Sequence, residues 1–197
     1  MSIATVTPHP RTAVTVSKPP TAKLWTVEEF HRLGELGIFE GRRAMLIHGS
    51  ILEEGPMNPP HAIAIELVAD ALRSIFGSGW RMRIQMPILL GREIDPEPDF
   101  AFVRGSARGT TIHPTTAALI VEVSDTSLKY DMTEKAVLYA TAGIPEYWVL
   151  DLNARQLHVY RQPVDGVYTT AFAVPAEGTV VPSAVPDGSI TIADLLP

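Results

Sequence analysis

The chain contains no cysteine among its 197 residues, and this absence excludes several kinds of chemistry. Without cysteine there is no disulfide framework, no thiolate nucleophile and no cysteine-ligated zinc. No run approaches the roughly 18 apolar residues that a membrane span needs, which argues against a transmembrane protein. The first residues also lack a continuous apolar segment behind a basic one, so they do not predict a secretory signal. We therefore expect a soluble cytoplasmic protein with no membrane partner.

Charge is also scarce, at 19% of residues, and its balance is acidic, with a net charge of −6 from 16 Lys and Arg against 22 Asp and Glu. Proteins that coat nucleic acid non-specifically are usually basic, because Lys and Arg displace counterions from phosphates. The acidic balance argues against such a coat, but it leaves open an enzyme whose carboxylates hold a cation beside a polyanion. Neither a Gly-x-Ser-x-Gly elbow nor a Walker-type phosphate loop occurs in the sequence.

The pattern of apolar residues predicts a tail followed by one domain. Residues 1–22 are rich in Pro and Thr without a helical period, and predict a flexible tail. Residues 23–197 then form a single domain of ordinary size. The elements expected in it are helices over 26–33, 61–76 and 131–142, a hairpin over 44–52, strands over 80–90, 100–103, 117–123, 147–150 and 157–160, and weak strands over 167–172 and 189–192.

Local signals set the ends and faces of the predicted helices. Thr26 with Glu29, and Asp131 with Glu134, have the spacing of a capping box, which predicts that helices begin there. Gly143 ends the second of these helices. In the long helix, apolar residues that step by four predict the buried stripe, namely Ile63, Leu67, Ala71 and Ile75, and the stripe is widened by Ile65, Val68 and Leu72.

The order of these elements predicts the fold class. The run Ala117–Val123 is apolar almost throughout, as expected of a central strand that is covered on both faces. Helices and strands alternate around it. The sequence therefore predicts an α/β or α+β protein with a central mixed sheet flanked by helices and an N-terminal β-hairpin.

Asp99, Glu122 and Lys135 carry the predicted chemistry. Asp99 follows Pro98 at a strand margin, and Glu122 lies inside an apolar strand, where an unpaired carboxylate is costly. Two such carboxylates can converge on a hard divalent cation such as Mg²⁺, which prefers oxygen ligands and activates water for attack on phosphorus. Lys135 lies near the predicted helix start, which is unfavourable for a cation, so a carboxylate or a phosphate is expected to hold it there.

Each of the three residues also has a plainer explanation in its local sequence. Asp99 fits a turn or cap residue after a Pro-rich corner, Glu122 one half of a buried ion pair with an arginine, and Lys135 a solvated helix lysine. The order of Pro-x-Pro-Asp, strand, apolar-Glu-apolar strand and helical Lys is more specific than any of the three alone.

The same order resembles the Uma-type (Uma-two) family of restriction-endonuclease-like proteins, in the PD-(D/E)XK nuclease superfamily, over about residues 25–196. The motifs that carry the resemblance are Pro98–Val103, Ile120–Ser124, Asp131 with Lys135 and Tyr139, and above all Ala142–Asp151. The resemblance implies a restriction-endonuclease-like core. It also implies a metal site at Asp99, Glu122 and the backbone carbonyl of Val123, with Mg²⁺ as cofactor and Mn²⁺ as the alternative. Ser124 occupies the usual position of the motif's lysine, whose role passes to Lys135.

One stretch departs from the family pattern. The family's hairpin usually reads close to Arg-Tyr-Glu-Leu-Ile-Asp-Gly-Glu, and here Met45, His48 and Ser50 replace its three acids. If the first of those acids assists the metal or the base, its loss bears on activity.

Three further residues are candidate substrate contacts, namely His61, Lys129 and Asp131. His61 matches a frequent family histidine at the start of the long helix, where a single local hydrogen bond is the alternative role.

These observations lead to two functional hypotheses. The first is a Mg²⁺-dependent endonuclease that hydrolyses phosphodiester bonds in nucleic acid, with DNA the favoured substrate and RNA left open. The second is a catalytically silent nuclease-like fold that acts as a binding or dimerisation module. For the enzyme we expect a homodimer, since nucleases with one site commonly pair about a two-fold axis to cut both strands. The strand edge near Leu157–Tyr160 and the long helix from His61 are the candidate surfaces.

Overall fold

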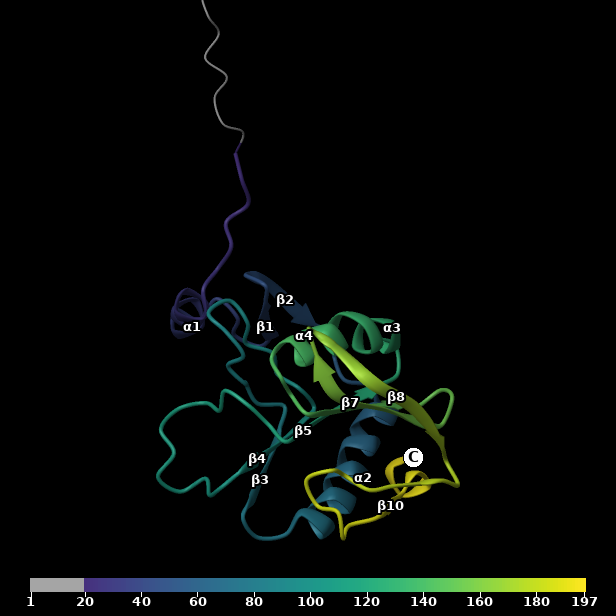
Figure 1. The fold of residues 1–197 in the computed structure, drawn as a ribbon. Coiled ribbons are helices and arrows are strands. Elements are labelled where there is room, and N and C mark those ends of the chain that lie inside the picture. The colour runs from purple at the N-terminus through teal and green to yellow at the C-terminus, as the bar shows by residue number, and fades with distance from the viewer. Residues whose placement is uncertain (1–19) are drawn as a thin grey trace, which may run out of the picture.

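The computed structural model describes residues 20–197, so almost all of the predicted tail lies outside the described residues. A six-stranded sheet forms the centre of the fold, in the order β3-β4-β5-β6-β7-β8 (Figure 1). Its strands are β3 (Trp80–Ile84), β4 (Phe100–Arg104), β5 (Leu119–Ser124), β6 (Glu146–Asp151), β7 (Gln156–Val164) and β8 (Val167–Pro175). Neighbouring strands are antiparallel except β5 and β6, which are parallel. The predicted mixed sheet is confirmed.

Helices and smaller elements surround this sheet. They are α1 (Val27–Glu35), the hairpin β1 (Arg43–Ile47) and β2 (Ser50–Glu54), α2 (Pro59–Phe76), the helical run of α3 (Leu128–Tyr130), η1 (Asp131–Lys135) and α4 (Ala136–Thr141), and the C-terminal β9 (Thr179–Val180), β10 (Ile190–Thr191) and η2 (Ile192–Leu195). Among residues 20–197, no helix has the length and apolar character needed to cross a membrane.

Two local predictions near the N-terminus are confirmed. The capping box at the start of α1 is complete: Thr26 Oγ1 accepts from the Glu29 amide at 3.2 Å, and Glu29 Oε2 accepts from the Thr26 amide at 3.0 Å. The hairpin turns through His48 and Gly49, both with positive φ. A Cβ at position 49 would lie 2.7 Å from Leu24 Cβ, so glycine is required there by close approach as well as by conformation.

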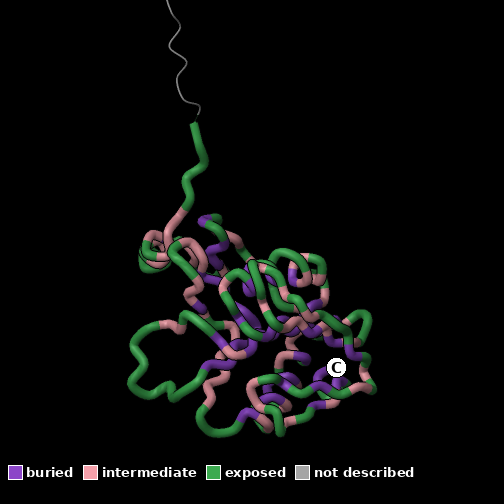
Figure 2. Tube along the Cα trace, viewed as in Figure 1, coloured by how far each residue is buried: buried purple, intermediate pink, exposed green. Residues whose placement is uncertain are grey.

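Each face of the sheet is covered by a different set of elements. On one face, Val68, Leu72 and Phe76 of α2 belong to an apolar cluster with β4, β5 and the C-terminal segment. On the other face, the helical run and the hairpin pack on β5 and β6 through residues such as Tyr139 and Tyr147. Figure 2 shows the resulting buried centre. Every residue of β5 is buried, as predicted for a central strand.

The predicted stripe of α2 is buried at Val68 and Leu72, but its centre differs from the prediction. The predicted Ile63 is 48% exposed, and Leu67, Ala71 and Ile75 are only partly buried. The fully buried set is Ala64, Val68, Leu72 and Phe76. Val68 and Leu72, expected at the margin of the stripe, lie at its centre, because spacing alone does not fix which of two neighbouring apolar rows faces the sheet. The helix also begins earlier than predicted, at Pro59, with Asn58 Oδ1 accepting from the His61 amide at 3.0 Å.

The predicted helix start at Asp131 is wrong. The helical run begins at Leu128, and residues 131–135 form a π-helical turn inside it. Asp131 makes no cap, because its carboxylate accepts hydrogen bonds from the hydroxyls of Ser124 and Ser127 instead. Lys135 consequently lies within the run rather than in a first turn. The predicted end is confirmed, with Gly143 at a φ of 72° directly after the run.

Two strand predictions also differ from the structure. The strand predicted over 80–90 ends at Ile84, where Gln85 adopts a positive φ. The edge predicted near Leu157–Tyr160 is not an edge, since β7 pairs with β6 on one side and with β8 on the other. The segment after residue 167, expected as a weak strand, extends to Pro175 and covers it. That surface is therefore not available for a dimer.

Candidate active site

A polar cavity of about 330 Å³ lies between the hairpin, the start of α2, the end of β5 and the helical run. It brings together six of the seven predicted site residues, which are His61, Asp99, Glu122, Val123, Asp131 and Lys135. Lys129 does not line it, and the Lys129 side chain is exposed. The residues that the sequence order placed on separate elements thus share one site.

Asp99 joins β4 to β5 through its backbone and its carboxylate. Its Oδ2 accepts from the Val123 amide at 2.8 Å, and its own amide donates to Glu122 Oε2 at 3.3 Å. His61 Nε2 at 3.3 Å and Gln85 Nε2 at 3.2 Å both contact its Oδ1. These are contacts between strands and with α2, rather than those of a simple turn or cap residue.

The charges around Asp99 favour its ionised form. Burial opposes ionisation of Asp99, but the hydrogen bond and charge of His61, the Val123 amide and Lys135 outweigh burial and lower the pKa of Asp99. Conversely, the hydrogen bond to Asp99 raises the pKa of His61 despite partial burial. The pair therefore favours a carboxylate beside a protonated imidazole.

Glu122 is buried on β5 between a phenol and an ammonium group. Its Oε1 accepts from the Tyr139 hydroxyl at 2.9 Å, and its Oε2 lies 3.1 Å from Lys135 Nζ. Burial raises the pKa of Glu122 to about 8, although the charge of Lys135 opposes this shift. The partner of the buried carboxylate is thus a lysine, and not the arginine considered from the sequence.

Lys135 is buried, with 6% of its surface exposed, so it is not a solvated helix lysine. Its Nζ lies 3.1 Å from Glu122 Oε2 and 3.1 Å from Asp131 Oδ1. Burial would lower the pKa of Lys135, but the charges of Glu122, Asp131 and Asp99 outweigh it and raise the pKa. The ammonium group is therefore held as a fixed positive charge beside the carboxylates.

Sequence reasoning missed several residues that support this network. Ser124 and Ser127 donate to Asp131, Tyr139 donates to Glu122, and the Tyr147 hydroxyl donates to the Asp131 carbonyl at 3.0 Å. The step of four from Asp131 through Lys135 to Tyr139 was visible in the sequence as a shared helix face. The serine contacts left no such signal, because they depend on how β5 meets the helical run.

The donor set fits a hard cation that keeps water ligands. Among residues 20–197, no three His, Cys, Asp or Glu side chains are already arranged as a metal cluster. Asp99 and Glu122 nevertheless place two carboxylates on one cavity, next to the backbone of Val123. Mg²⁺ commonly binds through one or two carboxylates and retains several waters, so a larger cluster is not required. A further positive charge would also favour ionisation of Glu122.

Only one of the three replaced hairpin acids concerns this cavity. Met45 lines it, whereas His48 lines a different cavity and Ser50 is exposed. The hairpin does supply two other acidic residues to the wall, Glu53 and Glu54, and Glu54 lies there in an ion pair of 2.9 Å with Arg43.

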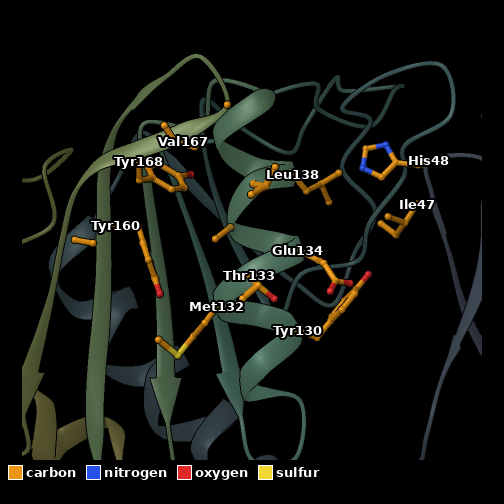
Figure 3. A pocket seen from close by; sticks show the side chains of 14 residues that line it. Ile47, His48, Tyr130, Met132, Thr133, Glu134, Leu138, Tyr160, Val167 and Tyr168 are labelled. Atoms are coloured by element: carbon orange, nitrogen blue, oxygen red, sulfur yellow. The ribbon is translucent and has the colours of Figure 1, made fainter.

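The second cavity, of about 560 Å³, is mainly apolar. Figure 3 shows residues of the helical run such as Met132 and Leu138, with Tyr160 and Tyr168 on one side and His48 on the other. None of the predicted site residues lines it. The chemistry predicted from the sequence therefore belongs to the smaller, polar cavity.

This architecture is a restriction-endonuclease-like nuclease fold, which gives the structural class of the protein. The crystal structure of "a putative nuclease belonging to DUF820" from Anabaena variabilis is similar, with a TM-score of 0.71 and 16% sequence identity over 86% of this chain and 96% of that one. The chain belongs to the Uma2 family, described as "Putative restriction endonuclease", whose model matches residues 27–193. The family confirms the resemblance and supports a nuclease-like function.

Two other comparisons do not bear on the function of this chain. The type IIG restriction endonuclease BpuSI matches with 18% identity over 62% of this chain and 13% of that one, at a TM-score of 0.37. No curated protein matches the chain.

Proposed function

We propose that this protein is a Mg²⁺-dependent endonuclease that hydrolyses phosphodiester bonds, with DNA the favoured substrate and RNA open. The observation that carries the proposal is the meeting of Asp99, Glu122 and Lys135 in one polar cavity. Two carboxylates beside a fixed ammonium group are the groups needed to hold a hard cation and a phosphate together. Membership of the Uma2 family supports the same class of reaction.

Each residue has a distinct role in this proposal. Asp99, Glu122 and the carbonyl of Val123 hold Mg²⁺ or Mn²⁺, which supplies charge stabilisation at phosphorus and activation of water when it is bound. Because its pKa is raised, Lys135 stays protonated; as an ammonium group it contacts the scissile phosphate and orients the attacking water, rather than deprotonating it. His61, which contacts Asp99 at the cavity wall, is a substrate contact.

One observation favours the alternative of a catalytically silent binding or dimerisation module. Met45 lines the cavity at a position where the family pattern carries an acid, so this copy offers one carboxylate fewer. A silent module would keep the fold and the Glu122–Lys135 pair but would not cleave nucleic acid in the presence of a divalent cation.

Cleavage by purified protein tests the proposal. Wild type, Asp99→Asn and the matched control Asp165→Asn are incubated with supercoiled plasmid and with RNA, in Mg²⁺ and in Mn²⁺. Asp165 lies exposed in the turn between β7 and β8, away from the cavity, at a positive φ that asparagine also adopts. We expect wild type and Asp165→Asn to cleave and Asp99→Asn to be inactive. No cleavage by wild type under any condition would favour the silent module.

We further expect the nuclease to act as a homodimer. Of the two surfaces predicted from the sequence, α2 retains an exposed face that includes Ile63. A monomer in light scattering at micromolar concentration would contradict this expectation.

A further inference from the structure

The carboxylate of Asp131 has its two oxygens committed to different partners. It is buried, with 1% of the residue exposed. Oδ2 accepts from the hydroxyls of Ser127, at 2.5 Å, and of Ser124. Oδ1 makes no such hydrogen bond and lies 3.1 Å from the ammonium nitrogen of Lys135. One oxygen is therefore fixed by hydroxyls, and this fixes the direction of the other toward the lysine.

The backbone at Asp131 is anchored as well. Residues 131–135 form a π-helical turn, an irregularity that occurs frequently at functional sites. The Tyr147 hydroxyl, from β6, donates to the Asp131 carbonyl oxygen at 3.0 Å. Asp131 is thus tied to the sheet through both its carboxylate and its backbone, by Ser124 of β5 and Tyr147 of β6.

Lys135 needs the contact with Asp131, because its other carboxylate partner, Glu122, also binds the cation in the proposed function. Its Nζ is equidistant from Glu122 Oε2 and Asp131 Oδ1, at 3.1 Å in each case. In the proposed function Glu122 is a cation ligand, so its oxygen is not reserved for the lysine. Asp131 is outside that ligand set. A buried ammonium group without a carboxylate partner is strongly disfavoured and would leave its position.

We propose that Asp131 is a positioning residue, which holds the Lys135 ammonium group in place when Glu122 serves the cation, and that Ser124 and Ser127 orient Asp131 for this task. The inference rests on the proposed function. The inference also gives Ser124 a role. Ser124 stands where the usual motif has its lysine, and it orients the carboxylate of Asp131, which holds the relocated Lys135.

A spectroscopic test uses metal-free protein and does not depend on cleavage. A buried, ion-paired lysine ammonium group exchanges its protons slowly and gives a proton–nitrogen NMR signal, which the Lys135→Arg variant assigns by its loss. The Glu122→Gln background removes the carboxyl group that the proposed function assigns to the cation. We expect the Lys135 signal to persist in Glu122→Gln and to disappear in Glu122→Gln/Asp131→Asn. Loss of the signal already in Glu122→Gln would overturn the inference, because Glu122 alone would then hold the lysine.

A kinetic test separates positioning from folding. We expect Asp131→Asn to lower kcat by about 10- to 100-fold, the range for a misplaced catalytic group, with KM and the Mg²⁺ Kd within about 3-fold of wild type. Ser124→Ala should reduce kcat in the same direction, and Ser124→Thr, which keeps the hydroxyl, should regain most of the loss. Unchanged kcat in Asp131→Asn, or equal kcat in Ser124→Ala and Ser124→Thr, would overturn the inference.

The outcomes keep the two proposals apart. If Asp131→Asn does not fold, the Ser124→Ala/Ser127→Ala variant keeps the charge and removes only the orientation, and it is expected to show the same fall in kcat. If wild type neither binds Mg²⁺ nor cleaves, the proposed function fails, and the NMR signals alone decide whether Asp131 holds Lys135.

Discussion

The two faces of the central sheet differ in what they bury. Alternate residues of β5 show the contrast, since Val121 and Val123 join the apolar cluster under α2, whereas Glu122 contacts Tyr139 and Lys135 under the helical run. Both faces bury an apolar cluster, and the α2 face also buries Glu146 in an ion pair with Arg161, whereas the opposite face encloses the larger charged network around Glu122 and Lys135. Buried charge costs free energy unless it is paired. The larger of the two apolar clusters lies under α2, so we infer that this face contributes the greater share of the apolar burial that stabilises the fold.

Replacement of Lys135 should have the largest effect on the charged face of the sheet. Lys135→Ala leaves Glu122 and Asp131 buried without their shared cation. We expect cleavage to fall by about two to three orders of magnitude, the range for a lost donor that stabilises transition-state charge, while Mg²⁺ binding persists. Rates on plasmid substrate and a calorimetric titration measure the two effects. Equal cleavage by Lys135→Ala and wild type would contradict the account and make Lys129 the next candidate.

A cavity on the α2 face should affect stability without affecting the site. Leu72 is fully buried, and Leu72→Ala should lower the free energy of unfolding by about 2–5 kcal/mol. Its neighbour Arg73 is exposed, so Arg73→Ala should change it by no more than about 0.5 kcal/mol. Urea denaturation measures both, and Mg²⁺ affinity should match wild type in each folded variant. A large loss of Mg²⁺ affinity in Leu72→Ala would show that the two faces are not separable.

The pH dependence of stability should report the buried carboxylate. Burial raises the pKa of Glu122 from 4.5 to about 8, so the folded state favours the protonated form. The stabilisation from this group is complete below the unfolded pKa and is lost as the pH rises through the folded pKa. Metal-free wild type should therefore lose stability between pH 4.5 and 8, and Glu122→Gln should lose less. Thermal melts across this range measure the difference, and parallel curves would count against a buried, protonated Glu122.

Restoring one hairpin acid should strengthen Mg²⁺ binding and lower the stability of the metal-free fold. Met45 lines the cavity, and Met45→Glu adds a carboxylate there, which should tighten Mg²⁺ binding by about three- to tenfold while lowering metal-free stability. Ser50→Glu, at an exposed position of the same hairpin, is the control and should change neither. Equal tightening by both variants would indicate a general charge effect rather than a ligand position.

The parts of the fold that the sequence predicted are those with a local cause. The capping box at Thr26 and the turn at Gly49 depend on near neighbours, and the apolar run of β5 predicts its own burial. The stripe of α2 was predicted in part, since Val68 and Leu72 belonged to it, but its centre was not, because only the packing against β4 and β5 decides which apolar row is buried most deeply.

The main residues of the site could be predicted from the sequence, but the residues that hold them in place could not. Asp99, Glu122 and Lys135 stand out because their charges fall where charge is costly or unusual, and the family resemblance adds to this. Asp131 was placed at a helix start because Glu134 follows at capping-box spacing. Its actual role depends on Ser124 at the end of β5, and no local pattern contains that contact.

Calorimetric titration of Mg²⁺ into metal-free wild type and Asp99→Ala tests the central claim most directly. The claim is that the polar cavity is a cation site formed by Asp99 and Glu122. We predict one saturable site in wild type and none in Asp99→Ala, with both proteins folded by circular dichroism. Equal binding by the two proteins, or no binding by folded wild type, would contradict it.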